Sequence, residues 1–286
     1  LAGVRSLGEY VFEGCTSLSG PLVLGDELVS IDRYAFADCT GLTGDLILPD
    51  TVTEVGNYAF RGCTGFSGDL SIGSSITRVG TGAFQNCSGF TGNLTIGGNG
   101  TEIEEKAFYY CSGFSGSLTL GNISVIGPYA FQGCSGFTGD LTLSGIESYG
   151  ASAFSSCGFT GTLYLQGDGT TVLSNGLFYG CGFTGLQLSG IASIGNSTFN
   201  NCSSITGSLV LPEGLTSIGY GAFEGCSGFS GSLVLPESLT SIDYSAFKNC
   251  SGFTGSLIFP DSITELGSSV FENCSGFSGT RLRKIT

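Results

Sequence analysis

One unit, repeated along the whole chain, limits what this sequence can fold into. Each of its 12 cysteines follows a phenylalanine by three residues, from Phe12 and Cys15 to Phe271 and Cys274. Neighbouring cysteines are 24 residues apart in eight of the eleven intervals. A fixed period of about 20 to 50 residues indicates a solenoid, in which each unit buries its apolar edge against its neighbours. We therefore expect a single solenoid domain over residues 1–286.

Each unit contains two pieces that suggest strands. Aligned on cysteine, the unit reads Phe-x-x-Cys-Ser-Gly-Phe-Thr-Gly-Ser-Leu-x-Leu-Pro-x-x-Leu-Thr-x-Ile-Gly-x-x-Ala. In the Leu-x-Leu piece leucine alternates with a variable residue, and glycine and proline bound the piece on its two sides. This pattern is typical of a strand with its leucines turned inward. The Leu-Thr-x-Ile piece predicts a shorter strand or turn on another side of the coil. The Gly-x-x-Ala-Phe-x-x-Cys piece is shorter than an average helix, so we expect extended backbone or one helical turn there.

The regular phenylalanines and cysteines predict rows of buried side chains. Equivalent residues of stacked coils point the same way, whereas a disulfide needs facing Cβ atoms about 3.8 Å apart. Free cysteine packs as a small hydrophobe, so we expect reduced thiols beside aromatic rings rather than disulfides between coils. The expected core ladder includes Phe84, Cys87, Phe108, Cys111, Phe131, Cys134, Phe223, Cys226, Phe247 and Cys250.

A motif within the unit resembles a known repeat family. From Leu215 to Cys226 and from Leu239 to Cys250 the chain reads Leu-Thr-Ser-Ile-x-x-x-Ala-Phe-x-x-Cys. This resembles the bacterial surface-antigen type of leucine-rich repeat, called BspA-like, and the likeness covers nearly the whole chain. It implies a mainly β leucine-rich-repeat solenoid, a right-handed stack of about twelve coils of 21–24 residues with a parallel sheet along one face. The Phe-Thr-Gly-Ser segment departs from the family unit by about one extra residue.

The resemblance also implies a cellular location and a biological role. Members of the BspA-like family are typically secreted or displayed on the surface of host-associated bacteria and some protists. They are implicated in adhesion to matrix proteins or to other cells. We therefore expect an extracellular or cell-surface protein. Leu1 falls inside a repeat, so we expect the chain to be a fragment, with any signal or anchor outside it.

The residue between the two leucines of each Leu-x-Leu piece is expected to face outward, and these residues form a candidate binding column. Its central members are polar with one tyrosine, and its ends are aliphatic. A rigid tyrosine beside adaptable polar side chains is typical of protein-binding surfaces, although β-branched residues also suit any exposed pleat. An ice-binding surface would need threonine throughout the column, which the chain lacks. The expected binding residues are Tyr164 at the centre with Thr142, Gln187, Thr119 and Thr95.

Composition argues against several classes of function. The chain has no histidine, so it lacks a Ser-His-Asp or Cys-His mechanism and offers no imidazole to a metal. No cysteine pair has zinc-ribbon spacing, and we expect no metal, no cofactor and no enzymatic activity. The net charge of −14 disfavours nucleic acid and anionic membranes as partners. No apolar run reaches the roughly 18 residues of a membrane span, so we expect no membrane insertion within this segment.

Two non-enzymatic functions remain. The first is an adhesion module whose sheet face binds an extracellular matrix, host-cell or neighbouring surface protein. The second is a structural repeat protein that assembles with copies of itself into an extracellular fibre or surface coat. In that case the basic residues Arg281, Arg283 and Lys284 are the expected contact to acidic coils of the next chain.

Overall fold

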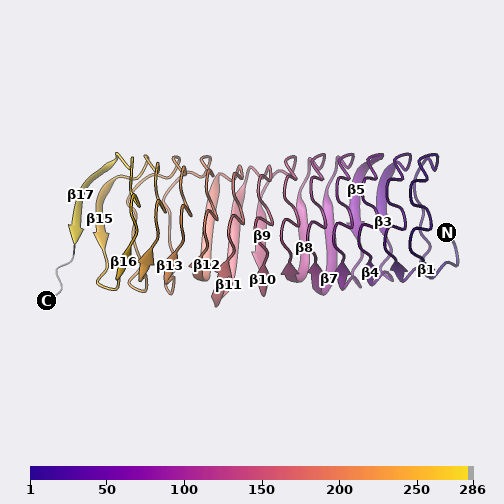
Figure 1. Cartoon of the computed structure of the whole chain (residues 1–286), viewed down its shortest axis with the longest axis horizontal. Coiled ribbons are helices and arrows are strands. Elements are labelled where there is room, and N and C mark those ends of the chain that lie inside the picture. The colour runs from indigo at the N-terminus through magenta and orange to yellow at the C-terminus, as the bar shows by residue number, and fades with distance from the viewer. Residues whose placement is uncertain (283–286) are drawn as a thin grey trace. The chain divides into compact units, whose positions relative to one another are not determined.

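The computed structural model describes the backbone of residues 1–282 and the side chains of residues 1–279. In this part the chain forms short and long β-strands joined by turns, without a helix (Figure 1). Equivalent residues of successive coils pair in parallel register, as where Leu46 pairs with Leu70 and Leu70 with Leu94. Parallel pairing at the repeat spacing is the pattern of a solenoid, so the expected mainly β solenoid is confirmed.

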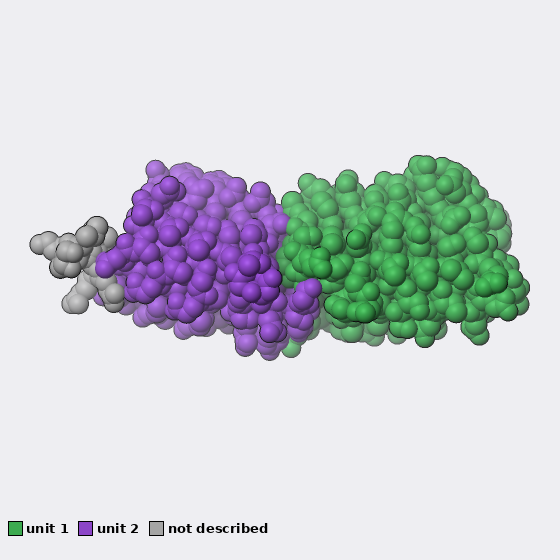
Figure 2. All heavy atoms as spheres, turned by 90° about the horizontal axis from the view of Figure 1, so that it is seen from below, with its two compact units in different colours: residues 1–141, 146–159 green, residues 142–145, 160–286 purple. Residues whose placement is uncertain are grey.

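The chain divides into two compact units, which Figure 2 distinguishes by colour. Unit 1 comprises residues 1–141 and 146–159, and unit 2 comprises residues 142–145 and 160–286. Each unit has hydrogen-bonded sheets of its own, and the two are described separately.

Unit 1 is built on a nine-stranded parallel sheet in which β7 joins two rows of strands. The first half of β7 pairs with β5, and its second half pairs with β6. β8 pairs with β7 along most of its length, and β10 pairs with β8. The strands are β1 (Ser6–Leu7), β2 (Ser30–Ile31), β3 (Gly44–Leu48), β4 (Glu54–Val55), β5 (Phe66–Ile72), β6 (Arg78–Val79), β7 (Leu94–Ile103), β8 (Leu118–Ile126) and β10 (Ser148–Tyr149).

Unit 2 contains a six-stranded parallel sheet in the order β16-β14-β13-β12-β11-β9 and a two-stranded sheet of β15 and β17. The first residue of β9, Leu141, belongs to unit 1. The strands are β9 (Leu141–Ser144), β11 (Thr162–Leu173), β12 (Gly185–Ile194), β13 (Ser217–Ile218), β14 (Ser241–Ile242), β15 (Gly255–Phe259), β16 (Glu265–Leu266) and β17 (Phe277–Leu282).

Where proline follows the first strand piece of a coil, the two pieces stay separate, although β5 and β6 are also separate with Gly73 and no proline between them. β3 ends at Leu48, directly before Pro49, and β15 ends at Phe259, directly before Pro260. Proline has no N–H for the ladder, so a strand does not continue through it. In β7, β8, β11 and β12 the corner has glycine and no proline, and one strand of 9 to 12 residues runs through both pieces. The expectation of two separate pieces is wrong for these four coils.

The second strand piece, rather than the first, carries the more continuous pairing in unit 2. β12, β13, β14 and β16 pair in order through this piece. In the first piece, Val210, Val234 and Ile258 are joined only by isolated bridges. Pro212 and Pro236 directly follow these short segments and keep them from lengthening.

The Gly-x-x-Ala-Phe-x-x-Cys piece forms a run of β-turns rather than extended backbone or a helical turn. The N–H groups of Ala37 and Cys39 donate to the carbonyl oxygens three residues before them, whereas Phe36 donates to Ala59 of the next coil at 2.7 Å. Tyr34 has a φ of 56°, and a left-handed residue interrupts a right-handed helix. The backbone thus alternates between bonds within the turn and bonds between coils.

Rows of phenylalanine and cysteine fill the core of both units. The rings of Phe84, Phe108 and Phe131 stack 5.1 to 5.2 Å apart and within 4° of parallel. Ten of the thiols donate to a phenylalanine carbonyl of an earlier coil, as Cys111 Sγ does to Phe84 at 2.9 Å. None of the twelve cysteines, all of which lie in the described part of the chain, forms a disulfide. The ten expected ladder residues are fully buried: Phe84, Cys87, Phe108, Cys111, Phe131, Cys134, Phe223, Cys226, Phe247 and Cys250.

Candidate functional site

A small hollow of mixed polar and apolar lining lies on the outward face of β9, β11 and β12 in unit 2. Thr142 from β9, Tyr164 from β11 and Gln187 from β12 line it, together with Gln166 and Ser189. Tyr164 and Gln187 are directly paired across the two strands. The hollow has a volume of about 230 Å³. The structure therefore brings together the three residues at the centre of the predicted column.

Strand alternation sets the direction of these side chains. Leu163 and Leu165, on either side of Tyr164, are 0% and 2% exposed. Because successive side chains of a strand point to opposite faces, Tyr164 faces out and is half-buried, while Thr142 and Gln187 are exposed. The lining has hydroxyl and amide groups but no ionisable carboxylate, lysine or arginine. Such a surface suits hydrogen bonding and aromatic contact rather than acid–base chemistry.

The other two predicted column residues lie in unit 1. Thr95 of β7 pairs with Thr119 of β8, and both side chains are exposed. Neither is among the residues that line the Tyr164 hollow. The five expected binding residues therefore fall into two groups, one in each unit.

The expected assembly contact falls at the limit of the described chain. Arg281 lies in β17, where its backbone pairs with that of Ile258, and its side chain is outside the described part. Arg283 and Lys284 lie outside the described residues. Self-assembly through these three residues stays a prediction.

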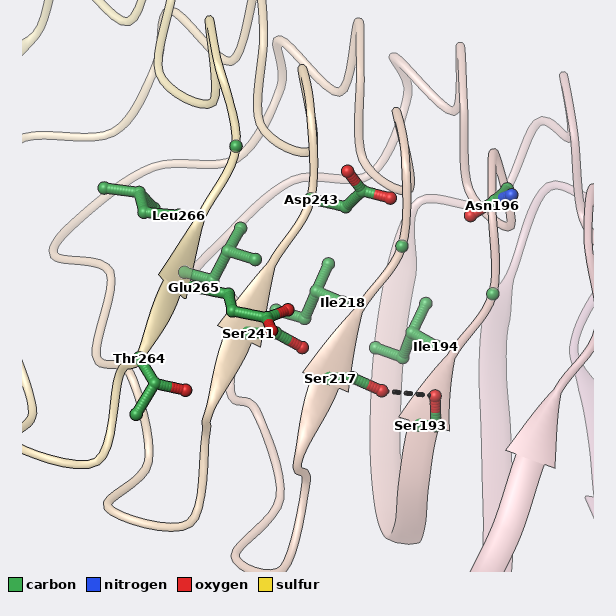
Figure 3. A pocket seen from close by; sticks show the side chains of 14 residues that line it. Ser193, Ile194, Asn196, Ser217, Ile218, Ser241, Asp243, Thr264, Glu265 and Leu266 are labelled. Carbon is green, nitrogen blue, oxygen red and sulfur yellow. Dashed lines mark hydrogen bonds between the residues drawn. The ribbon is translucent and has the colours of Figure 1, made fainter.

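A larger groove, which the sequence analysis missed, crosses β12, β13, β14 and β16 (Figure 3). Its volume is about 670 Å³. Four equivalent positions on the successive paired strands line the groove, in the order Ser193, Ser217, Ser241 and Glu265. The hydroxyl oxygens of Ser193 and Ser217 are 2.6 Å apart. Asp243 adds a second carboxylate to the lining.

Coil stacking accounts for the shape of this groove. Gly219 and Gly267 line it, and a Cβ on either would meet the backbone of the preceding coil, at Asn196 and Tyr244 respectively. Close packing on the preceding coil accounts for glycine at these two corners, whereas Asp243 occupies the equivalent corner of the coil between them. The repeated Ser-Ile-Gly of the sequence is the signal from which such a groove could have been expected. We assign it no ligand.

The cysteines offer no reactive thiol in the core. Burial raises the pKa of the Cys87, Cys111 and Cys226 thiols above the ordinary value. A thiol must ionise to act as a nucleophile or metal ligand. Among residues 1–282 no three cysteine or acidic side chains are grouped so as to hold a metal ion. In the same part of the chain no helix has the length and apolarity needed to cross a membrane.

A charged network in unit 1 connects neighbouring coils. Arg78 donates through Nε to Glu104 at 2.6 Å and through Nη2 to Asn57 at 2.6 Å, and it also pairs with Glu54. Burial tends to raise the pKa of Glu104, but hydrogen bonds from Arg78 and Thr81 lower it below its ordinary value. Since every carboxylate of this network already pairs with Arg78, we interpret it as a link between coils and not as a binding site.

Comparison with known proteins gives a family match along the chain. The model of the BspA type leucine rich repeat region matches residues 2–115, 66–183 and 171–284. No curated protein matches the chain in sequence. Among solved structures, the chain is similar to a leucine-rich repeat protein from Bacteroides ovatus, with 19% identity, a TM-score of 0.48, and 98% of this chain and 88% of that chain covered.

Two further solved structures are similar to this chain. One is a leucine rich cell surface protein from Faecalibacterium prausnitzii, with 18% identity, a TM-score of 0.45, and 99% of this chain and 84% of that chain covered. The other is the pneumococcal vaccine antigen PcpA, with 16% identity, a TM-score of 0.43, and 98% of this chain and 75% of that chain covered.

Proposed function

Because the chain belongs to the BspA-type leucine-rich repeat family, we propose that it is a secreted or cell-surface module that binds other proteins and catalyses no reaction. Members of this family are typically secreted or surface-displayed, which supports the proposed extracellular or cell-surface location. The observation that carries the binding role is the hollow in which Tyr164, Thr142 and Gln187 meet.

The chemistry of the hollow suits a protein partner. A tyrosine ring held between strands supplies contact area at low entropic cost, and neighbouring hydroxyl and amide groups adapt their hydrogen bonds to the partner. Burying this surface removes no ion from water, because its lining residues are uncharged. The partner we propose is an extracellular matrix, host-cell or neighbouring surface protein.

The binding role is tested with the variant Tyr164→Ala and the control Tyr179→Ala. Tyr179 is another tyrosine of unit 2, 42% exposed, and does not line the hollow. Both variants and the parent are assayed on an immobilised panel of extracellular matrix proteins and host-cell surface proteins. We expect Tyr164→Ala to weaken binding by about tenfold or more, as loss of a central aromatic anchor does. Equal binding by all three proteins would contradict the role of the hollow.

The alternative function is a structural protein that assembles with copies of itself. Experiments on the same purified protein distinguish this function from the adhesion module. The parent and a variant with Arg281, Arg283 and Lys284 changed to Glu are compared by light scattering over a concentration series. Parent assembly that the variant loses, together with no binding to any protein of the panel, would favour the fibre or coat over the adhesion module.

A further inference from the structure

Unit 2 carries a stripe of exposed aliphatic side chains on its outward face. Val210, Val234 and Ile258 follow one another in register on three coils. They are 70%, 70% and 45% exposed. We call these three residues the aliphatic stripe. Contiguous exposed apolar side chains with a polar border often mark a site of protein interaction.

An acidic row runs beside the aliphatic stripe. Each stripe residue is followed three positions later by an exposed carboxylate, and these are Glu213, Glu237 and Asp261. Lys248 is the single cation among the side chains described in unit 2, and it pairs with Glu272 at 3.2 Å. Unit 2 has eight acidic residues against four basic ones, so its net charge is negative, which favours a positively charged partner.

We propose that the aliphatic stripe and the acidic row together bind a cationic amphipathic helix of a partner protein. The occupant presents apolar side chains to the stripe and lysine or arginine to the carboxylates. Helices of this kind dock through anchors at positions i, i+3 or i+4, and i+7. None of these six residues lines the Tyr164 hollow, so the inference does not depend on that site.

The spacing of the coils favours a helix over an extended peptide. In the same three coils the buried rings of Phe199, Phe223 and Phe247 repeat at 5.2 and 5.3 Å, so the stripe spans about 10.5 Å. Positions i and i+7 of a helix are about 10.5 Å apart along its axis. Three same-face residues of a strand span about 13 Å and would lose register with the coils.

The proposal is tested with a fluorescently labelled synthetic helix of about 18 residues, which is long enough to fold in part on its own. It has leucine at i, i+4 and i+7 and lysine along one flank. One control peptide has the same composition arranged with period two, and another has glutamate in place of lysine. Fluorescence anisotropy at low and high salt measures their binding to the whole chain. We expect saturable binding of the cationic helix alone, weakened by salt.

Protein variants locate the site. Val234→Ser removes the centre of the stripe, Glu213→Lys reverses one charge of the row, and Val172→Ser alters an aliphatic of unit 2 that is 57% exposed and lies outside the stripe. We expect each of the first two to weaken binding about tenfold or more and Val172→Ser to change it less than about twofold. Circular dichroism melts check that all variants fold.

Several results would overturn the proposal. Equal binding of the period-two peptide would show that the helix register is irrelevant. Equal weakening by Val172→Ser and Val234→Ser, or no saturation by any peptide, would remove the site. Self-association of the parent that Val234→Ser abolishes would make a second copy of the chain the occupant in place of a cationic helix.

Discussion

Cys134 illustrates how one position in the repeat controls the chemistry of its side chain. Its Sγ donates to the carbonyl of Phe108 at 3.1 Å, and the residue is fully buried. Burial raises the pKa of this thiol above the ordinary value. A neutral, hydrogen-bonded thiol among phenylalanine rings is a poor nucleophile, so the row of cysteines serves packing.

The number of cysteines that react with an alkylating reagent should therefore differ between the native and the denatured chain. We expect 12 labels on the denatured, unreduced protein, because none of the 12 cysteines forms a disulfide. On the native protein at pH 8 we expect labels only at Cys15 and Cys274, which are half-buried while the other ten are buried. Intact-mass analysis counts the labels and peptide mapping places them. Fewer than 12 labels after denaturation without reductant would mean that disulfides form.

The raised pKa values also predict loss of stability in alkali. Burial raises the thiol pKa of Cys87 and Cys226 in the folded state above the ordinary value of 9.0, so the unfolded chain releases these protons first. Their contribution to stability is complete below pH 9 and declines above it, by about 1.4 kcal/mol per buried thiol for each pH unit. Urea unfolding at pH 8 and pH 10.5 measures the effect. The loss should be smaller in the double variant Cys87→Ala/Cys226→Ala, and equal losses would contradict the assignment.

Phe131 in the core and Thr119 on the surface allow the stability effects of a buried and an exposed side chain to be compared. Phe131 is 0% exposed and stacks at 5.1 Å on both Phe108 and Phe154, whereas Thr119 is exposed on β8. Deleting the buried ring in Phe131→Ala should cost about 3 to 5 kcal/mol of unfolding free energy. Thr119→Ala should change it by less than about 0.5 kcal/mol. Chemical denaturation of both variants is the test, and similar losses would reverse the inside and outside assignment.

At the scale of the coil, local patterns predicted the strand pieces but not where they merge. Period-two alternation placed Leu163 and Leu165 inside and Tyr164 outside, as the structure has them. The long strands depend on corners whose path is set by neighbouring coils. In β11 the register shifts between Gln166 and Thr171, and no residue pattern within one repeat specifies that shift. The hollow beside Tyr164 was therefore predictable as a column position but not as a concave site.

The Ser-Gly-Phe glycine is a second feature that only stacked coils explain. Gly89 does not have a positive φ, yet a Cβ there would overlap the carbonyl oxygens of Thr64 and Phe66 in the preceding coil. Gly8 has no such neighbour and no positive φ. We expect Gly89→Ala to lower the unfolding free energy by about 1 to 3 kcal/mol through overpacking, and Gly8→Ala to leave it nearly unchanged. Thermal melts compare the two, and equal melting temperatures would refute the close approach.

At the scale of the whole molecule, the regularity of the repeat varies along the chain. The central cysteine intervals, between Cys111 and Cys202, are 23, 23, 24 and 21 residues, whereas all others are 24. In a solenoid, stability is a sum of the terms within coils and between nearest neighbours, so cooperativity is weakest where a repeat departs from its period. The expectation of one domain over residues 1–286 therefore depends on how strongly these central coils are coupled.

Unfolding of the intact chain tests that expectation. The Phe-x-x-Cys unit continues through the centre at Phe154 and Phe178 without an intervening linker, so we expect one cooperative transition in calorimetry with equal calorimetric and van't Hoff enthalpies. The variants Phe84→Ala in unit 1 and Phe247→Ala in unit 2 remove equivalent buried rings. Each should move the whole transition to lower temperature, because a shared cooperative stack spreads a local loss over all its coils. Two transitions, of which each variant moves only one, would instead make the units separate domains.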